Sequence, residues 1–293
     1  MELNRDIVTT PLRAAATVVM LRDTPSGLEV FLMQRHGLSD VLGGAYVFPG
    51  GKVDAADGEL DMAAHLDQPL TVLHAGLNEP DISERTAGGL YVAAVREAFE
   101  ESGVLMAQGP AGQGVDCDRA GALLREGEGF NAMLAALGLR LQTRQLVPWT
   151  RWITPTSPSV MNKRFDTRFF VAAVPDGQVA VHDDHETTAS VWLSPRRALQ
   201  AYWDDQIALA PPQIMSLAQL SHHGSVASVV AQARGRLPPV IAPEPFDLEG
   251  GRMICYPGDA RHSIGAPAMP GPTRLYYRNK RFEPDGGFAS LFE

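Results

Sequence analysis

The most informative stretch of the chain reads Arg96-Glu97-Ala98-Phe99-Glu100-Glu101-Ser102-Gly103-Val104. Apolar residues recur at helical spacing over residues 90–102, and the glycine that follows is a typical C-terminal stop. On such a helix Glu97, Glu100 and Glu101 stand at i, i+3 and i+4, so their carboxylates share one face. Like charges at this spacing cost a few tenths of a kcal/mol per pair, so this face of the helix calls for an explanation.

Two explanations fit the three carboxylates. Oxygen-only clusters are what Mg²⁺ or Mn²⁺ prefers, with waters and substrate phosphates completing the coordination. Arg96 lies one turn before Glu100 and could hold that carboxylate in place. The alternative is a solvated acidic helix face, and the apolar residues on the opposite face are compatible with both.

A glycine loop upstream favours the metal site. It reads Phe48-Pro49-Gly50-Gly51-Lys52-Val53-Asp54, and together with the glutamate helix it resembles the Nudix box. In that family the loop and the helix hold a divalent metal against a diphosphate. The resemblance implies a Nudix α/β/α sandwich with a mixed sheet. The order of predicted strands and helices, which has no βαβ rhythm, independently favours an α+β fold.

The spacing inside the box departs from the family pattern. The family has a glutamate six positions after the second glycine, where this chain has Asp57, and Arg96 comes about thirty residues late. We therefore expect an insertion at about residues 55–89. An interrupted box is similar to that of the peroxisomal-type coenzyme A diphosphatases and their bacterial relatives, which residues 151–155 and 164–170 also resemble. Asp57 and Glu84 are both left open as counterparts of the family's separate glutamate.

The length of 293 residues fits one enlarged domain better than two independent ones. We expect a Nudix hydrolase domain over residues 1–203, with the insertion inside it. Residues 204–293 are then a helical and Pro/Gly-rich C-terminal extension packed on the same domain. A separate interaction element is the alternative to a packed tail or a dimer arm, and a homodimer is among the expected assemblies.

The resemblance implies roles for particular residues. Glu97 and Glu101 correspond to the usual metal ligands, with Glu100 assisting, and all three are expected to be catalytic. Mg²⁺, or Mn²⁺, would neutralise the diphosphate and lower the pKa of bound water. The Gly50-Gly51 loop would approach the metal through its backbone. Glu186, some residues before a tryptophan, is a candidate general base or additional ligand; the box helix itself could also supply the base.

The candidate phosphate-binding residues are Arg35, Lys52 and Arg164. The formal charge of −9 argues against binding to a nucleic-acid polymer, which needs a basic surface, but not against a small polyanion. The longest apolar run near the start is too short for a bilayer and no cationic signal precedes it, so we expect a cytoplasmic protein without a membrane partner. Two distant cysteines exclude a disulfide framework.

The sequence therefore predicts a metal-dependent hydrolase of a nucleoside diphosphate linked to another moiety, with coenzyme A or acyl-coenzyme A as the favoured substrate. A Nudix pyrophosphatase acting on ADP-ribose, dinucleotides or sugar nucleotides is the alternative with the same site. An alternative of another class is a Nudix-like ligand-binding regulatory module without catalysis. The retention of all three helix glutamates argues against that last hypothesis.

Overall fold

A mixed sheet lies at the centre of the computed structural model, which describes residues 3–37, 42–160, 162–183, 187–249 and 251–293. In this part of the chain the sheet has eight strands in the order β10-β7-β8-β1-β2-β3, with β4 paired to β1 and β9 paired to β2. The strands are β1 (Arg13–Thr24), β2 (Gly27–Arg35), β3 (Tyr46–Val47), β4 (Gly50–Lys52), β7 (Val147–Ile153), β8 (Phe165–Ala173), β9 (Thr187–Leu193) and β10 (Val240–Ile241).

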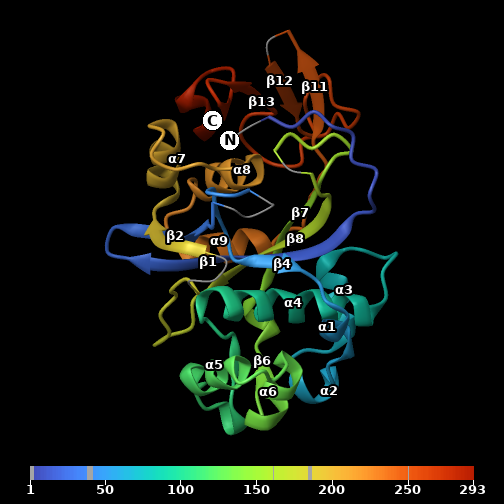
Figure 1. Cartoon of the computed structure of the whole chain (residues 1–293), viewed down its shortest axis with the longest axis vertical. Coiled ribbons are helices and arrows are strands. Elements are labelled where there is room, and N and C mark those ends of the chain that lie inside the picture. Colours follow the sequence, from blue (N-terminus) through green and yellow to red (C-terminus); the bar gives the residue numbers. More distant parts are fainter. Residues whose placement is uncertain (1–2, 38–41, 161, 184–186, 250) are drawn as a thin grey trace.

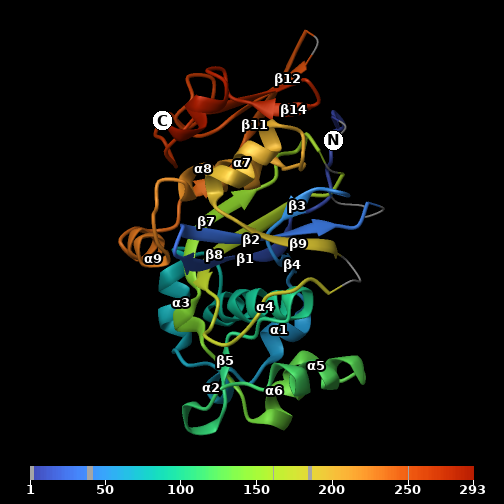
Figure 2. The same cartoon turned by 90° about the vertical axis from the view of Figure 1, so that its left-hand side faces the viewer.

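Helices cover both faces of this sheet (Figures 1 and 2). In both views α4 lies directly below the strands, with α5 and α6 further down, and α7 and α8 lie above. The α/β/α sandwich and the α+β class predicted from the sequence are thus confirmed. The helices are α1 (Ala55–Glu59), α2 (Met62–His65), α3 (Leu70–Leu77), α4 (Glu84–Ser102), α5 (Cys117–Arg125), α6 (Phe130–Leu137), α7 (Pro195–Trp203), α8 (Pro211–Leu220) and α9 (Val226–Arg234).

The first strand explains why the sheet is buried on both sides. Val18 and Met20 belong to the core around α4, whereas Val19 and Leu21 belong to the core around α7 and α8. Successive side chains of a strand point to opposite faces, so a continuous apolar run is what a strand between two helical layers requires. This strand runs parallel to β8 and antiparallel to β2, which makes the sheet mixed.

One edge of β1 is shared between two partners. Its C-terminal end, from Leu21 onward, pairs with β2, and residues 15–17 pair with the glycine strand β4. A separate two-stranded antiparallel sheet consists of β5 (Ala107–Gln108) and β6 (Arg140–Leu141), and α5 and α6 lie between these strands in the sequence. The pairing with β4 holds the glycine loop in the middle of the sheet, next to α4.

Helix α4 begins at Glu84, six residues before the start at Leu90 that the sequence predicts. Ser83 caps the helix by accepting the backbone N–H of Thr86 at 3.0 Å. Gly88 weakens the helical pattern, yet a Cβ there would lie 2.5 Å from Met62 Sδ. The glycine therefore serves close packing of α2 on α4, and the insertion outside the helix is residues 55–83.

The C-terminal extension shares a core with the rest of the chain. Strand β10 joins the main sheet in parallel with β7. A second, antiparallel sheet follows, with β11 (Glu244–Leu248), β12 (Gly251–Cys255), β13 (Arg274–Arg278) and β14 (Arg281–Glu283). Ile254 and Phe282 from this sheet lie in the same buried cluster as Trp152.

Among the helices of the described residues, none has both the length and the apolar composition needed to cross a membrane.

Candidate active site

A cavity of about 460 Å³ opens where the glycine strand, α4 and the ends of β1, β2 and β8 meet. Its charged lining residues are two acids and four bases, and they come from segments far apart in the sequence. The cavity is lined by Arg13, Ala15, Thr17, Arg35, Leu42, Val47, Phe48, Gly50, Gly51, Lys52, Glu97, Glu101, Trp152, Thr154, Lys163, Phe165, Thr167, Phe169, Pro212 and Gln213. It contains most of the site residues predicted from the sequence.

The glycine loop contacts both cavity-facing glutamates. The backbone N–H of Gly50 donates a hydrogen bond to Glu101 Oε2 at 2.7 Å. Its φ of +155° is a conformation that other residues rarely adopt, and a Cβ there would lie 2.6 Å from Thr17 Cα. A Cβ on Gly51 would lie 2.5 Å from Glu97 Oε2. The loop can reach the carboxylates because both positions lack a side chain.

Arg96 organises the remaining carboxylates from behind the cavity. Its Nε and Nη2 donate to the two oxygens of Asp57 at 2.8 and 2.9 Å, and its Nη1 donates to Glu97 at 2.8 Å and Glu100 at 3.0 Å. Burial alone would lower the pKa of Arg96, but the hydrogen bond to Asp57 and the charges of Glu97, Asp57 and Glu100 outweigh it and raise the pKa. The guanidinium is therefore permanently charged and fixes Glu97 in position.

Asp57 is a site residue that the sequence left open. It lies in α1, at the start of the insertion, and its side chain is 1% exposed. Besides binding Arg96, it accepts the backbone N–H of Asp54 at 2.8 Å. The signal was its position, six residues after Gly51, where the family pattern has a glutamate. Glu84, the other residue left open, is exposed at the first turn of α4.

The three predicted helix glutamates do not lie alike. Glu97 and Glu101 line the cavity, whereas Glu100 does not and keeps 40% of its side chain exposed beside Arg96. Partial burial raises the pKa of Glu100, and the charge of Arg96 opposes that rise only in part. The geometry therefore separates Glu97 and Glu101, which could hold a metal, from Glu100, which pairs with Arg96.

The donor set fits Mg²⁺ or Mn²⁺ held together with a substrate. Among the described residues, no group of three or more His, Cys, Asp or Glu side chains is arranged to hold a metal by itself. Glu97 and Glu101 lie one helical turn apart at a cavity with room for phosphates. Mg²⁺ is usually bound through one or two carboxylates, with waters and substrate phosphates supplying the other ligands. These two residues would hold the ion.

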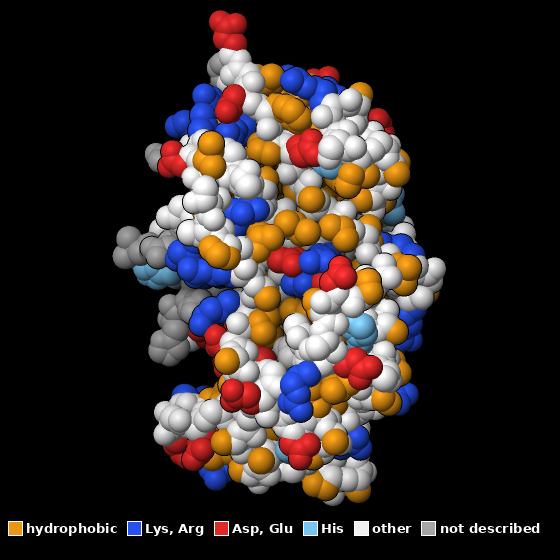
Figure 3. All heavy atoms as spheres, turned by 90° about the vertical axis from the view of Figure 1, so that its right-hand side faces the viewer, with side chains coloured by type: hydrophobic (Ala, Val, Ile, Leu, Met, Phe, Trp, Pro, Cys, Tyr) orange, Lys and Arg blue, Asp and Glu red, His pale blue; other side chains and the backbone are white. Residues whose placement is uncertain are grey.

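Two of the three predicted phosphate-binding cations line the cavity. Arg35, at the end of β2, and Lys52, at the end of β4, both do. Arg164 does not: its Nε donates to the carbonyl oxygens of residues 154 and 155 at 3.3 and 3.1 Å. Arg13 and Lys163 line the cavity instead, and no motif marked them. Figure 3 shows blue Lys and Arg side chains gathered at mid-height along one margin of the molecule, despite the net charge of −9.

Glu186, the candidate general base, lies outside the described residues, and its role stays a prediction. Nearby, Thr187 Oγ1 donates to Asp183 Oδ1 at 2.9 Å. The alternative, a base from the box helix, also stays open. To act as the general base, Glu186 or a residue of the box helix would have to accept a proton from a water beside Glu97 and Glu101.

A second buried arginine cluster lies outside the cavity. Arg168 Nε donates to Glu79 Oε1 at 2.9 Å, and Arg151 Nη1 lies 2.9 Å from Glu79 Oε2. Arg151 also pairs with Asp166 at 2.7 Å. Arg151 and Arg168 therefore bind carboxylates. Because Glu79 belongs to the insertion, this cluster attaches the end of the insertion to the sheet.

Comparison with known proteins places this geometry in a family. A model of the NUDT19 Nudix domain matches residues 5–220. Two similar proteins are the acyl-coenzyme A diphosphatases NUDT19 of Xenopus laevis and Homo sapiens. The first is 26% identical over 279 residues, covering 81% of this chain and 72% of that protein. The second is 28% identical over 246 residues, covering 72% of this chain and 65% of that protein, just under two thirds of its length.

A solved structure shares the architecture. The crystal structure of a Nudix hydrolase from Alicyclobacillus acidocaldarius superposes with a TM-score of 0.63 and 28% sequence identity. The match covers 76% of this chain and 97% of that one. The similarity therefore extends over nearly the whole of that bacterial protein.

Proposed function

The chain belongs to the NUDT19 Nudix domain family and is a Nudix-type phosphoanhydride hydrolase, and from this premise we propose that it hydrolyses the diphosphate of coenzyme A or acyl-coenzyme A. Two relatives carry that activity in their names. Within this chain, one observation carries the proposal. The cavity brings Glu97 and Glu101 together with four cationic side chains, which is the combination of charges that a metal-bound diphosphate needs.

Different residues of the cavity bind the phosphate oxygens and the metal ion. Arg13, Arg35, Lys52 and Lys163 attract and bind the phosphate oxygens, so the cavity is locally basic in an acidic protein. Glu97 and Glu101 hold Mg²⁺ (or Mn²⁺). When bound, this ion neutralises the diphosphate and lowers the pKa of bound water.

Supporting groups keep the two carboxylates in place. The backbone N–H of Gly50 orients Glu101, and Arg96 orients Glu97 while Asp57 orients Arg96. Groups that fix metal ligands in this way commonly change metal affinity or activity by about 10- to 100-fold when removed. We therefore regard Arg96 and Asp57 as positioning residues.

The reaction adds one water molecule across the phosphoanhydride. The water oxygen forms a new bond to phosphorus, and the bridging oxygen leaves with the other phosphate. For acyl-coenzyme A the products are two phosphomonoesters, adenosine 3′,5′-bisphosphate and an acyl-phosphopantetheine. ADP-ribose, dinucleotides and sugar nucleotides share the same diphosphate, so they are the competing substrates.

A substrate panel tests the proposal. The purified full-length chain with Mg²⁺ is assayed by chromatography against coenzyme A, acyl-coenzyme A, ADP-ribose, NADH and diadenosine polyphosphates. We expect the highest kcat/KM for the two coenzyme A substrates and the release of adenosine 3′,5′-bisphosphate. A preference for ADP-ribose or a dinucleotide would refute the substrate assignment, and a lack of turnover of every diphosphate would refute the hydrolase itself.

A further inference from the structure

The basic residues of the catalytic cavity are spread along its length. Strand β1 gives the scale, because its residues 13, 15 and 17 all line the cavity and side chains two apart in a strand share one face. Thr17 pairs with Gly50, and Ala15 pairs with Lys52. Arg13 lies two residues beyond Ala15, or about 7 Å further along the strand. Lys52 therefore belongs to the end of the cavity that holds the glycine strand, and Arg13 to the other end.

The parallel strand β8 brings a second cation to the end where Arg13 lies. Arg13 pairs with Phe165, and its backbone N–H donates to the carbonyl oxygen of Arg164 at 3.0 Å. Lys163 directly precedes Arg164 and lines the same cavity. Arg13 and Lys163 thus form a basic pair built from two segments that are 150 residues apart in the sequence.

The metal-holding carboxylates lie at the opposite end from this pair. The backbone N–H of Gly50 donates to Glu101 at 2.7 Å, and Gly50 pairs with Thr17, four residues from Arg13 and so roughly 13 Å away along β1. The two phosphates of a diphosphate share one bridging oxygen and both lie close to the metal. A diphosphate held there does not account for Arg13 and Lys163.

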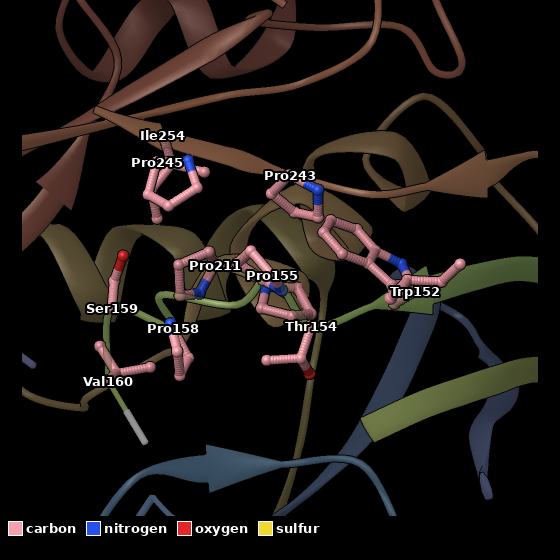
Figure 4. A pocket seen from close by; sticks show the side chains of 12 residues that line it. Trp152, Thr154, Pro155, Pro158, Ser159, Val160, Pro211, Pro243, Pro245 and Ile254 are labelled. Atoms are coloured by element: carbon pink, nitrogen blue, oxygen red, sulfur yellow. The ribbon is translucent and has the colours of Figure 1, made fainter. Parts of the chain in front are cut away.

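A small apolar pocket lies at the same end of the cavity as the basic pair (Figure 4). It has a volume of about 80 Å³ and shares Trp152, Thr154 and Pro212 with the cavity. Thr154 N–H donates to the carbonyl oxygen of Phe165 at 2.9 Å, which places the pocket beside the start of β8. Six of the twelve described residues that line it are prolines, which have no backbone N–H, and none of the twelve is charged. An anionic group at this end would therefore bind the basic pair.

Coenzyme A has an anionic group in a matching position. Besides its diphosphate it carries a phosphomonoester on the 3′-oxygen of the ribose, one sugar ring away from the diphosphate. We propose that Arg13 and Lys163 form a subsite for this 3′-phosphate, so that the nucleotide half of the substrate lies along β1. The guanidinium of Arg13 can bind two phosphate oxygens at once, and Lys163 adds a second positive charge.

This subsite would select among the competing substrates. The proposal rests on the proposed function, because it gives a role to a group that coenzyme A has and that ADP-ribose, NADH and sugar nucleotides lack. All of these compounds offer the same diphosphate to the metal, so the metal end of the cavity cannot distinguish them. A contact with the 3′-phosphate can, and charge-assisted hydrogen bonds of this kind change affinity by about tenfold or more.

Binding of nucleotides that cannot be hydrolysed as diphosphates tests the assignment. Adenosine 3′,5′-bisphosphate, adenosine 2′,5′-bisphosphate and AMP are titrated calorimetrically into the full-length chain with Mg²⁺. We expect the 3′,5′ compound to bind at least about tenfold more tightly than AMP and more tightly than the 2′,5′ compound, which has the same charge in another position. Equal affinity of the two bisphosphates, or of the 3′,5′ compound and AMP, would overturn the proposal.

Variants at the two ends of the cavity show where the 3′-phosphate binds. Arg13→Gln and Lys163→Gln should each lower the ratio of 3′,5′-bisphosphate affinity to AMP affinity at least about threefold, and the double variant should bring the ratio close to one. Lys52→Gln should weaken binding of all three nucleotides and keep the ratio. Arg197→Gln, on an exposed residue outside the cavity, is the matched control and should change nothing.

The ratio compares two ligands on the same protein, so a partly unfolded variant still gives a valid result. If Arg13→Gln and Lys163→Gln weaken all three nucleotides equally, these residues bind the 5′-phosphate and the assignment is wrong. A ratio that falls in Lys52→Gln and is retained in the other two variants would likewise refute it.

A kinetic comparison separates this proposal from the proposed function. Coenzyme A and 3′-dephospho-coenzyme A are assayed with the wild type, and we expect kcat/KM to be at least about tenfold higher for coenzyme A, mainly through a lower KM. Equal values would overturn the subsite while the chain remains a coenzyme A diphosphatase. The nucleotide titrations need no turnover, so a failure of the hydrolase assay leaves their result intact.

Discussion

The two buried arginine clusters are built from the same groups and differ in their balance of charge. In one, Arg151 and Arg168 face Glu79 and Asp166, two positive charges against two negative ones. In the other, Arg96 alone has three carboxylates within 3.0 Å. The charges of the first cluster therefore balance without a ligand. The second has an excess of negative charge, and its surplus lies beside the cavity, where a divalent cation would compensate it.

Both clusters also attach the insertion to the Nudix core. Asp57, near its start, binds Arg96 on the box helix, and Glu79, near its end, binds Arg168 on the sheet. The insertion therefore interrupts the box in sequence without separating its parts in space. The comparison shows that a buried ion pair can support the fold or the site, and that the charge balance around it distinguishes the two roles.

The largest expected effect is on stability and concerns the balanced cluster. Glu79→Gln leaves the buried Arg168 and the partly buried Arg151 with one carboxylate, and loss of one partner from a buried pair typically lowers the free energy of unfolding by about 3–5 kcal/mol. Urea denaturation followed by circular dichroism measures it. Glu29→Gln, which breaks the exposed Arg22–Glu29 pair, is the control and should cost less than about 1 kcal/mol. Similar losses in both variants would contradict the assignment of Glu79 as a buried anchor.

The next effect is on catalysis and concerns the unbalanced cluster. Glu101→Gln removes a metal-holding carboxylate and should lower kcat/KM at least about a hundredfold, or roughly 2.7 kcal/mol of transition-state stabilisation, with folding intact. Glu84→Gln, on an exposed residue of the same helix, should keep wild-type activity. Retained turnover in Glu101→Gln would show that the metal is held elsewhere.

The ion pair between Arg274 and Asp259, in the C-terminal extension, should make the stability of the fold depend on pH, with an effect of intermediate size. Burial would raise the pKa of Asp259, but hydrogen bonds from Arg274, Arg261 N–H and Thr273 outweigh it and lower the pKa to about 2. Because the folded pKa lies below the unfolded value of 3.8, ionised Asp259 stabilises the fold above pH 4, and this contribution is lost as the pH falls toward 2.

Its magnitude can be checked with Asp259→Asn. The shift corresponds to roughly 2 kcal/mol at neutral pH, so the variant should be less stable than the wild type by about that amount at pH 7. The difference should shrink between pH 4 and pH 2 in chemical denaturation curves. A difference that stays constant over this range would mean that the pair with Arg274 does not set the pKa.

The smallest expected effect on the free energy of unfolding is that of Glu97→Gln, in contrast to the large effect of Glu79→Gln. Glu97→Gln relieves the excess negative charge beside Arg96, so the metal-free protein should change in unfolding free energy by less than about 1 kcal/mol. The same variant should lose the rise in Tm that Mg²⁺ gives the wild type, since a ligand stabilises only the state that binds it. Thermal scans with and without Mg²⁺ measure both, and a strong destabilisation without metal would contradict the surplus-charge interpretation.

The sequence could predict the box because its chemistry is local. Glu97 and Glu101 share a helix face by spacing alone, and the two glycines precede them in a recognisable loop. The start of the box helix was predicted too late because Gly88 and Gly89 interrupt its pattern. Their reason is tertiary packing, which no helical period encodes.

The cations of the cavity show the other limit. Arg13 and Lys163 lie in the cavity because β1 and β8 are parallel neighbours, and their pairing begins at Arg13 and Phe165. The sequence predicts the adjacent Arg164 as a phosphate-binding residue, but its side chain donates to backbone carbonyls. Which of two neighbouring basic residues faces a cavity depends on strand register, and register is fixed by contacts between distant segments.

The pairing of β10 with β7 also bears on solubility. Strand β7 is rich in apolar residues, and the tail covers it through Val240 and Ile241 and through a hydrogen bond from Arg151 N–H to the carbonyl oxygen of Pro239. An uncovered apolar strand at the border of a sheet offers its backbone to other molecules and promotes aggregation. The residues of the tail that extend the main sheet therefore also protect it from intermolecular pairing.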